Sequence, residues 1–155
     1  MLRRLRPSDV DAVLAVYHDA VITQATGLYT IQQIQAWAAH AANDPGVRAA
    51  LLRGHGLVSH ATRPDRIEGF ALLDPPCRLS LLYCRGSASR QGHGRALVQA
   101  LEAHAQAAGC RQLRTEASRL SRPLLERLGW QVEAEECVLF AGVHFGRWRM
   151  IRDLT

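Results

Sequence analysis

Residues 82–97 of the chain read Leu82-Tyr83-Cys84-Arg85-Gly86-Ser87-Ala88-Ser89-Arg90-Gln91-Gly92-His93-Gly94-Arg95-Ala96-Leu97. Just before and into this stretch, an apolar run from Leu79 to Cys84 predicts a short buried strand that ends at polar turn residues. A loop with glycines follows, and then apolar residues recur at helical spacing from Leu97 to Ala108. The stretch therefore predicts a strand, a glycine-bearing loop and a helix in direct succession.

This succession is suited to holding phosphate. The first N–H groups of a helix have no partner within the helix, and the helix dipole adds partial positive charge there. Gly92 and Gly94 have no Cβ that would keep an anion away from the backbone. Arg90 and Arg95 can pair with phosphate oxygens. The alternative is a turn that glycine makes easier to form and that binds no ligand.

Residues 91–96 carry a more specific pattern. Gln91-Gly92-His93-Gly94-Arg95-Ala96 fits Q/R-x-x-G-x-G/A, and by this motif the chain resembles the GNAT superfamily of N-acetyltransferases. The stretch does not fit the P-loop, which needs Lys followed by Ser or Thr after the second glycine, and it does not fit the dinucleotide motif G-x-G-x-x-G. The resemblance implies that the loop binds the pyrophosphate of acetyl-CoA.

The rest of the chain predicts alternating strands and helices. Ser8 with Asp11, and Thr30 with Gln33, have the spacing of a capping box and predict two early helices. A brief helical stretch runs to Leu52; the central helix stops at Gly109 in the C′ position, and a last helix begins at Ser118 or Ser121 and runs to Leu128. Strands are expected at residues 2–6, 56–62, 67–73, 79–84, 112–117, 131–140 and 143–152, with a hairpin turn at residues 63–66.

The resulting order, βαα-βββ-α-β-α-ββ, is similar to that of the GNAT fold over essentially the whole chain. We therefore expect one α/β (α+β) domain over residues 1–155, with a mixed, centrally splayed sheet flanked by helices. Residues 124–130 resemble the late F-Y-E-x-x-G-F segment of the family. Residues 29–38 and 142–145, with Met150, resemble a bacterial branch of it.

Composition narrows the class of protein. The 155 residues include no lysine, and the net charge is +5. The 19 basic residues are all arginines spread along the chain, and the few aromatic residues are not interleaved with them, so we expect no nucleic-acid partner. Part of the positive excess suits an anionic cofactor such as CoA. No apolar run has the length of a membrane span and the N-terminus lacks a signal-peptide core, which predicts a cytoplasmic protein without a membrane partner.

The cysteines and histidines give no metal signal. Cys77, Cys84, Cys110 and Cys137 lack the C-x-x-C spacing of zinc sites and redox pairs, and no two histidines have the spacing of metal ligands. A cytosolic setting favours free thiols at all four positions. We therefore expect no metal and no disulfide.

The resemblance also implies where acetyl-CoA binds. The cofactor would lie where the strands at residues 79–84 and 112–117 part, with its pantetheine arm paired to the backbone of Leu82, Tyr83 and Cys84. The N–H of Cys84 would stabilise the developing oxyanion. Ser118 takes the place of the usual asparagine. The residues expected to hold the pyrophosphate are Arg90, Gln91, Gly92, His93, Gly94, Arg95 and Ala96.

The sequence departs from the family at the catalytic positions. Leu125 replaces the tyrosine that often acts as general acid, and Ser80 replaces the usual acidic residue on the strand. Glu116, near the end of the second parting strand, is the candidate base; its alternative role is a carboxylate paired with an arginine. Tyr29 lines the acceptor pocket, donates a proton, or is a packing anchor. Tyr83 is a candidate acid or a core residue.

The sequence thus predicts an acetyl-CoA-dependent N-acetyltransferase in which a primary amine of a small molecule or peptide attacks the thioester directly in a ternary complex. Two alternatives stay open: an acyl-CoA-binding or regulatory module that is catalytically impaired, and an enzyme that uses a longer acyl donor. Many relatives form dimers, so the resemblance also allows a homodimer. Glu68 and Asp74 are weaker candidates for the base.

Overall fold

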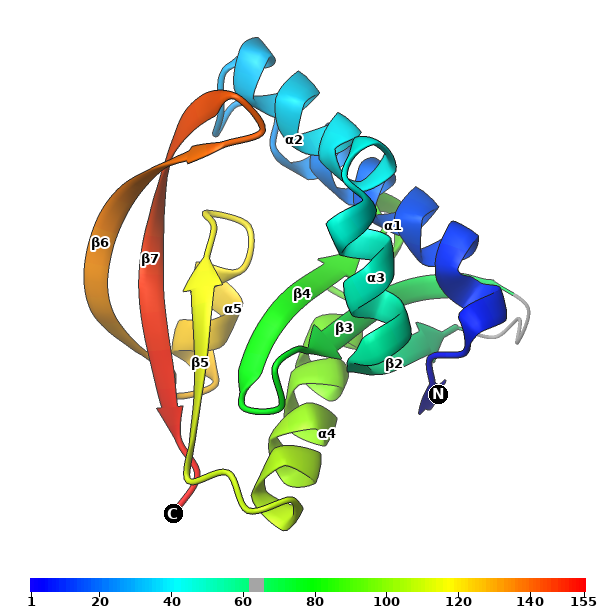
Figure 1. The fold of residues 1–155 in the computed structure, drawn as a ribbon, viewed down its shortest axis with the longest axis vertical. Coiled ribbons are helices and arrows are strands. Elements are labelled where there is room, and N and C mark those ends of the chain that lie inside the picture. Colours follow the sequence, from blue (N-terminus) through cyan, green and yellow to red (C-terminus); the bar gives the residue numbers. More distant parts are fainter. Residues whose placement is uncertain (62–65) are drawn as a thin grey trace.

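The computed structural model describes residues 1–61 and 66–155, and the described strands form one mixed sheet (Figure 1). Their order across the sheet is β1-β2-β3-β4-β5-β7-β6. Neighbouring strands are antiparallel except β4 and β5, which are parallel. The strands are β1 (Leu2–Arg4), β2 (His55–His60), β3 (Ile67–Leu73), β4 (Arg78–Cys84), β5 (Gln112–Ala117), β6 (Gln131–Phe140) and β7 (Val143–Asp153).

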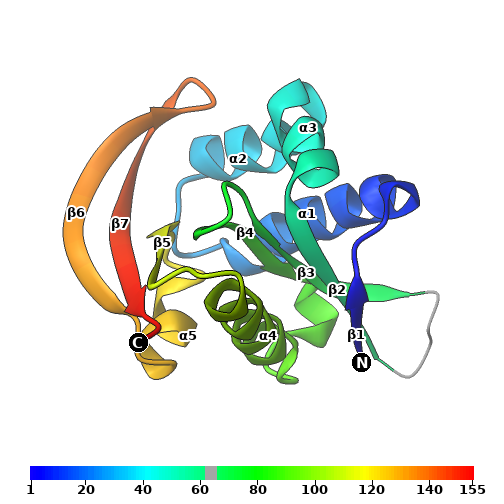
Figure 2. The same ribbon diagram turned by 60° about the horizontal axis from the view of Figure 1, so that its bottom comes forward.

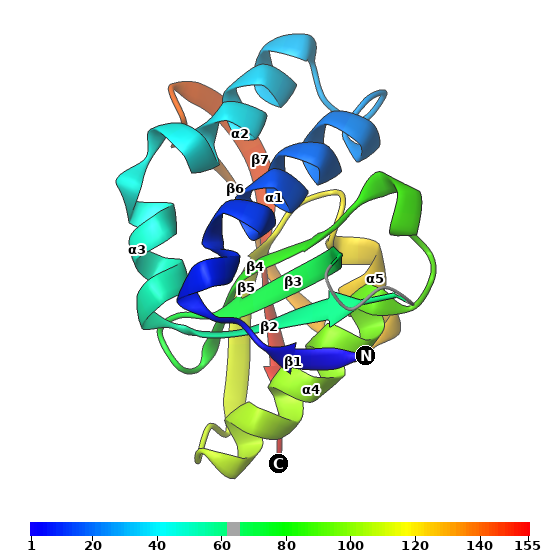
Figure 3. The same cartoon turned by 90° about the vertical axis from the view of Figure 1, so that its right-hand side faces the viewer.

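Helices cover both faces of this sheet (Figure 2). One face carries α1 (Val10–Gln24), α2 (Ile31–Asn43) and α3 (Pro45–Arg53), and the other carries α4 (His93–Ala107) and α5 (Arg122–Arg127). Figure 3, seen from the β1 edge, shows the same arrangement, with α1 above the sheet and α4 below it.

The core accordingly has two layers. Phe70 packs with Val13 and Tyr17 of α1, whereas Ala71, the next residue, packs with Leu97 and Leu101 of α4. Successive side chains of a strand point to opposite faces, so β3 serves both layers and is buried at every residue. This explains why its sequence, apart from Glu68, has no polar residues alternating with the apolar ones.

β4 and β5 part soon after they begin, which confirms the expected splayed sheet. The described pairing consists of Arg78↔Arg114 and Leu79↔Thr115. At the same level Ser80 is an extra residue in β4, because Leu72 and Leu73 of β3 pair with Leu81 and Leu79. Such a bulge bends and twists the strand that contains it. The bend turns the remainder of β4 away from β5.

The helix ends confirm some predicted signals and contradict others. Thr30 and Gln33 form the predicted capping box, with reciprocal hydrogen bonds of 2.9 and 3.1 Å. Gly109, at φ +99°, lies just beyond α4 as predicted. The predicted cap at Ser8 is wrong: α1 begins at Val10, after a 3₁₀ turn at Pro7–Asp9. The Asp9 carboxylate accepts two 2.8 Å hydrogen bonds from Arg3, an ion pair that the local spacing could not show.

The last helix begins at the second of the two predicted positions, but without the expected side-chain cap. Ser121 occupies the N-cap position of α5, yet its hydroxyl accepts a hydrogen bond from the N–H of Ser118. The Ser118 hydroxyl in turn accepts from the N–H of Leu120. The two serines therefore brace the turn between β5 and α5 instead of capping the helix.

Most of the hairpin turn predicted at residues 63–66 lies outside the described residues.

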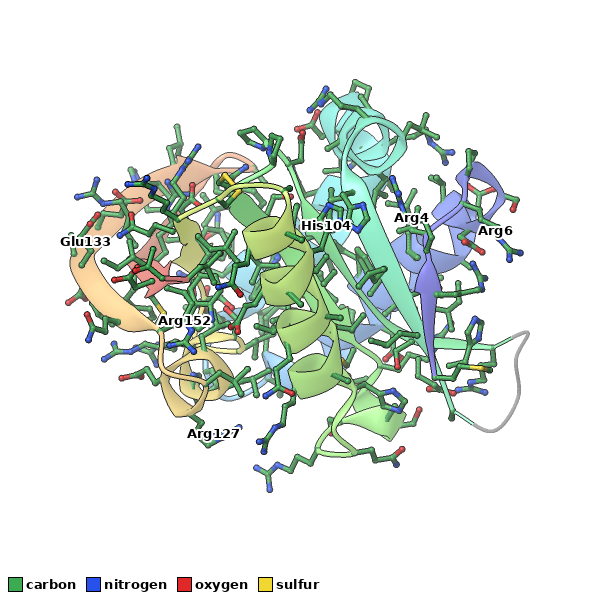
Figure 4. The ribbon with its side chains drawn as sticks, turned by 90° about the horizontal axis from the view of Figure 1, so that it is seen from below. Arg4, Arg6, His104, Arg127, Glu133 and Arg152 are labelled. Carbon is green, nitrogen blue, oxygen red and sulfur yellow. A yellow bond between two sulfur atoms is a disulfide. The ribbon has the colours of Figure 1, made fainter. Side chains whose placement is uncertain are left out.

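The expectation of four free thiols is wrong. Cys77, in the turn between β3 and β4, forms a disulfide with Cys110, which follows α4 (Figure 4). The two cysteines are 33 residues apart in sequence, but the fold brings their Cα atoms to 5.8 Å. Cys84 and Cys137 are free.

Among the described helices, none has the length and apolar character needed to cross a membrane.

We predict that Cys77→Ser lowers the free energy of unfolding of the oxidised protein by about 2–4 kcal/mol, because the disulfide restricts the unfolded chain across a long loop. Denaturant titration with and without reductant measures this. Cys137→Ser, at an exposed free thiol, is the control and should change stability by less than about 0.5 kcal/mol. Equal stability of wild type and Cys77→Ser without reductant would contradict the prediction.

Candidate functional site

The first part of the site is the free edge of β4 where it leaves β5. Arg85 donates its N–H to the carbonyl of Glu68 at 2.8 Å, so this N–H faces β3. In an antiparallel pair, the N–H and C=O groups of successive residues point alternately towards and away from the partner strand. The backbone groups of Tyr83 therefore face β3, and those of Leu82 and Cys84 face away from it. The Cys84 carbonyl accepts a 2.7 Å hydrogen bond from the Gln24 side chain. The N–H groups of Leu82 and Cys84 are thus turned towards the gap.

The second part is the N-terminus of α4, directly after β4. Gly92 occupies the N-cap position at φ +85°, and no side chain of the described residues caps the helix there. The first hydrogen bond of the helix runs from the N–H of Ala96 to the carbonyl of Gly92, at 3.0 Å. The N–H groups of His93, Gly94 and Arg95 precede it and are the helix's free donors. Arg90, Gln91 and Arg95 are exposed around them, so the loop fits a diphosphate.

In the structure His93 and Gly94 also make contacts within the protein that the sequence motif did not predict. The Nδ1 atom of His93 lies 2.6 Å from the hydroxyl of Ser59, so this ring ties the start of α4 to β2. A Cβ on Gly94 would lie 2.8 Å from Cδ2 of Leu124, so the end of this partly exposed side chain would have to move to accept a larger residue where α4 packs on α5. Gly92 has open space around it, so its backbone conformation is what favours glycine.

On the opposite side of the β4–β5 gap lies a cleft of about 420 Å³. Its upper part lies between α2 and the β6–β7 hairpin, which are side by side in Figure 1. Aromatic rings form much of its wall: Tyr17, Tyr29, Trp37, Tyr83, Phe140 and Phe145. The Tyr29 and Trp37 rings pack edge to face with their centroids 5.3 Å apart, a favoured geometry for aromatic pairs. The wall is therefore a pre-formed apolar surface.

Two phenols of this wall are candidate proton donors. The Tyr83 hydroxyl accepts a 3.1 Å hydrogen bond from the Trp37 indole, and burial raises the pKa of Tyr83 to about 12. The Tyr29 hydroxyl accepts a 2.9 Å hydrogen bond from the backbone N–H of Arg119, and burial raises its pKa as well. In both cases the oxygen accepts and the phenol keeps its proton, which remains available for donation.

Glu116 lines the cleft at the end of β5, and its carboxylate is paired with an arginine. Both of its oxygens accept from Nε of Arg78, at 3.1 and 3.2 Å. Ser80 and Glu116 each follow the last β4–β5 pair, Leu79↔Thr115, so both stand where the strands part. Ser118 and Leu125 line the same cleft. The hydroxyl of Ser80 is buried and has no hydrogen-bond partner among the described residues. This place thus brings together a carboxylate and an unsatisfied hydroxyl.

The other candidates have different surroundings. Asp74 borders the cleft and pairs with Arg53 at 2.8 Å, whereas Glu68 is buried and pairs with Arg66 at 2.8 Å. Burial raises the pKa of the Cys84 thiol to about 11, which leaves it protonated and a poor nucleophile.

Sequence reasoning missed three polar groups of the cleft wall. The Nε2 atom of His40 lies 3.3 Å from the carboxylate of Asp44. The two residues are four apart in sequence, a spacing from which this pair could have been predicted. Arg78 and Arg147 had no such signal, because their partners Glu116 and Glu136 lie on other strands. All three side chains line the same cleft.

Comparisons with known proteins agree with this geometry. A family model described as an acetyltransferase (GNAT) domain matches residues 25–151. A GCN5-related N-acetyltransferase from Rhodopseudomonas palustris superposes with a TM-score of 0.89 at 27% identity, covering 99% of this chain and 94% of that one. PaiA N-acetyltransferase from Thermoplasma acidophilum, in complex with coenzyme A, gives a TM-score of 0.77 at 16% identity, covering 99% and 98%. No curated protein matches the sequence.

A third similar structure is a phosphinothricin acetyltransferase from Sinorhizobium meliloti in complex with AcCoA. It superposes with a TM-score of 0.68 at 18% identity, covering 99% of this chain and 87% of that one. At such low identity the likeness concerns the fold.

We predict that Gly94→Ala changes the free energy of unfolding by less than about 1 kcal/mol, because the added methyl group displaces only the end of the partly exposed Leu124 side chain while alanine gains helix propensity. Leu124→Ala should relieve the contact between the two side chains. In a double-mutant cycle measured by denaturant titration, the double variant should therefore lose at least about 0.5 kcal/mol less than the sum of the single variants.

Gly92→Ala is the control for this cycle. It strains a left-handed backbone without meeting a neighbour, so it should be destabilising yet additive with Leu124→Ala. Additivity of Gly94→Ala with Leu124→Ala would show that the added methyl group does not displace Leu124.

Proposed function

The chain belongs to the GNAT acetyltransferases, and on that premise we propose that it transfers the acetyl group of acetyl-CoA to a primary amine by direct attack in a ternary complex. The observation that carries the proposal is the parting of β4 and β5. The gap has a helix N-terminus with free donors on one side and an apolar cleft on the other. Donor and acceptor can therefore approach one point from opposite sides.

Acetyl-CoA supplies an acyl group that is activated as a thioester. We propose that residues 90–96 hold its pyrophosphate through the free N–H groups of α4 and the flanking arginines. The N–H groups of Leu82 and Cys84 would bind the pantetheine arm and the thioester oxygen. The CoA and AcCoA complexes of the Thermoplasma and Sinorhizobium proteins support this assignment. We place the reaction in the cytoplasm, where the donor is available.

The acceptor must lose protons while the new C–N bond forms and the C–S bond breaks. We assign the base to Glu116, whose carboxylate is held in the cleft by Arg78. The unpartnered hydroxyl of Ser80 stands in the same part of the cleft and would relay a proton between the acceptor nitrogen and the carboxylate. The leaving sulfur takes up a proton, and we assign its donation to Tyr83, with Tyr29 as the second candidate.

One observation favours a second function, that of a catalytically impaired acyl-CoA-binding module. Leu125, which stands where the family often has its acidic tyrosine, is only 1% exposed and belongs to the core. The carboxylate of Glu116 is already committed to Arg78. Both functions predict binding of acetyl-CoA, and only the first predicts turnover.

We predict that Glu116→Gln lowers kcat about 100-fold or more while the affinity for acetyl-CoA is unchanged, because the amide keeps the shape and cannot accept a proton. Thiol release with a panel of primary amines measures turnover, and calorimetry measures acetyl-CoA binding. Glu126→Gln, on the exposed face of α5, is the matched control. If wild-type protein binds acetyl-CoA and transfers to no amine, the binding module is the correct function.

The raised pKa values of the two tyrosines predict the alkaline side of the pH profile. A general acid works while it is protonated, and with a pKa of about 12 Tyr83 stays protonated until the pH rises to that value. We therefore expect kcat to hold level from about pH 8 to about pH 10, and Tyr83→Phe to lower it across that range. A fall of wild-type kcat with a midpoint below about pH 9 would rule out both phenols as the acid.

A further inference from the structure

We propose that the acceptor amine also carries a carboxylate and an apolar side chain, as a free aromatic α-amino acid does, and that Arg147 binds this carboxylate. The inference rests on the proposed function and specifies its substrate class. It follows from the three kinds of group that line the cleft: aromatic rings, carboxylates that are already paired, and an arginine, Arg147, whose two Nη nitrogens both lack a partner among the described residues.

The aromatic rings favour an apolar body. The rings of Tyr29, Trp37 and Phe145 are mutual neighbours, with centroids 5.3 to 6.2 Å apart, and Phe140 packs edge to face on Phe145 at a centroid distance of 5.6 Å. These rings come from the loop before α2, from α2 itself and from the β6–β7 hairpin, so the surface exists only in the folded chain. Burying an apolar side chain of the acceptor against it would stabilise the complex.

The carboxylates of the cleft disfavour a polycationic acceptor. Asp74 pairs with Arg53 at 2.8 Å, and Glu116 pairs with Arg78 at 3.1 Å. Asp44 pairs with His40 and also accepts a 2.8 Å hydrogen bond from the N–H of Gly46. Each carboxylate on the described wall thus has a partner within the protein, and binding a second ammonium group would require breaking one of these pairs.

Arg147 has more free donors than the other two arginines of the cleft, since Arg53 and Arg78 each use one Nη nitrogen as well as Nε for contacts within the protein. Arg147 lies on β7 two residues beyond Phe145 and therefore on the same face of the strand, which faces the cleft. Its Nε donates to Glu136 at 2.7 Å, which holds the side chain in place. Its two Nη nitrogens have no hydrogen-bond partner among the described residues. A guanidinium anchored in this way presents donors that suit a carboxylate.

The surrounding charge favours an anion at this point. Glu136 is shared by Arg147 and Arg149, whose Nε lies 3.8 Å from its other oxygen. Two guanidinium groups therefore face one carboxylate and leave a net positive charge beside the aromatic wall. An acceptor with a carboxylate on the carbon next to its amine would place that carboxylate on Arg147, with its side chain on the rings and its nitrogen towards the β4–β5 gap.

The test uses the full chain, acetyl-CoA and four amines: L-phenylalanine, L-phenylalaninamide, phenethylamine and spermidine. The first three share an aromatic ring, and only L-phenylalanine has the carboxylate. We expect kcat/KM for L-phenylalanine to exceed that for each of the other three at least about tenfold, the discrimination expected from one charge-assisted pair.

Variants then locate the carboxylate site. Arg147→Gln should raise KM for L-phenylalanine at least about tenfold, with kcat and KM for acetyl-CoA changed less than about threefold, and Arg147→Lys should restore part of the loss. Arg127→Gln is the control, because Arg127 is an exposed arginine of α5 that does not line the cleft, and it should leave all constants within about twofold.

The outcomes separate this inference from the function on which it rests. Preference for phenethylamine, phenylalaninamide or spermidine, or an Arg147→Gln effect equal for all amines, overturns the carboxylate-bearing acceptor and leaves the acetyltransferase intact. Binding of acetyl-CoA without turnover of L-phenylalanine also overturns it. Failure of acetyl-CoA to bind in calorimetry would instead overturn the proposed function.

Discussion

The structure depends on the short pairing between β4 and β5. These two parallel strands are joined at Arg78↔Arg114 and Leu79↔Thr115, and the Thr115 hydroxyl closes the junction with a 2.6 Å hydrogen bond to the carbonyl of Leu79. Beyond it each strand has a different partner. β5 stays paired with β7 along its whole length, while β4 follows β3. The gap therefore leaves each strand with backbone hydrogen bonds to its other neighbour, β7 for β5 and β3 for β4.

The groups that matter for chemistry gather around this junction from separate parts of the chain. Arg78 comes from the start of β4, Ser80 from the bulge in the same strand and Glu116 from the end of β5. α2 and the β6–β7 hairpin add the aromatic wall, and α4 places its N-terminus at the far end of β4. The hydrogen bond between His93 and Ser59 and the contact of Gly94 with Leu124 hold that helix in place. Binding groups on one side and reactive groups on the other are thus positioned by the same sheet.

Much of the fold could be predicted because its signals are local. The strands predicted at residues 67–73 and 112–117 have the bounds of β3 and β5 in the structure. Thr30 with Gln33 set the start of α2, and Gly109 marked the end of α4. The same local reasoning failed at Ser8, where Asp9 serves Arg3 from across the turn, and at Ser118 and Ser121, where two hydroxyls satisfy the turn and not the helix. Short polar side chains have several local partners, and spacing alone does not choose among them.

By itself the sequence determined the order of the elements, the glycine-bearing loop at the start of α4 and the family resemblance, because each depends on residues close together in the chain. Only the tertiary structure decided which cysteines pair, that Glu116 is held by Arg78, that Gly94 packs against Leu124, and that Arg147 faces an aromatic cleft. The physical reason is the same in each case. These contacts join residues far apart in sequence, and their energies depend on distances that exist once the sheet and its two helical layers have assembled.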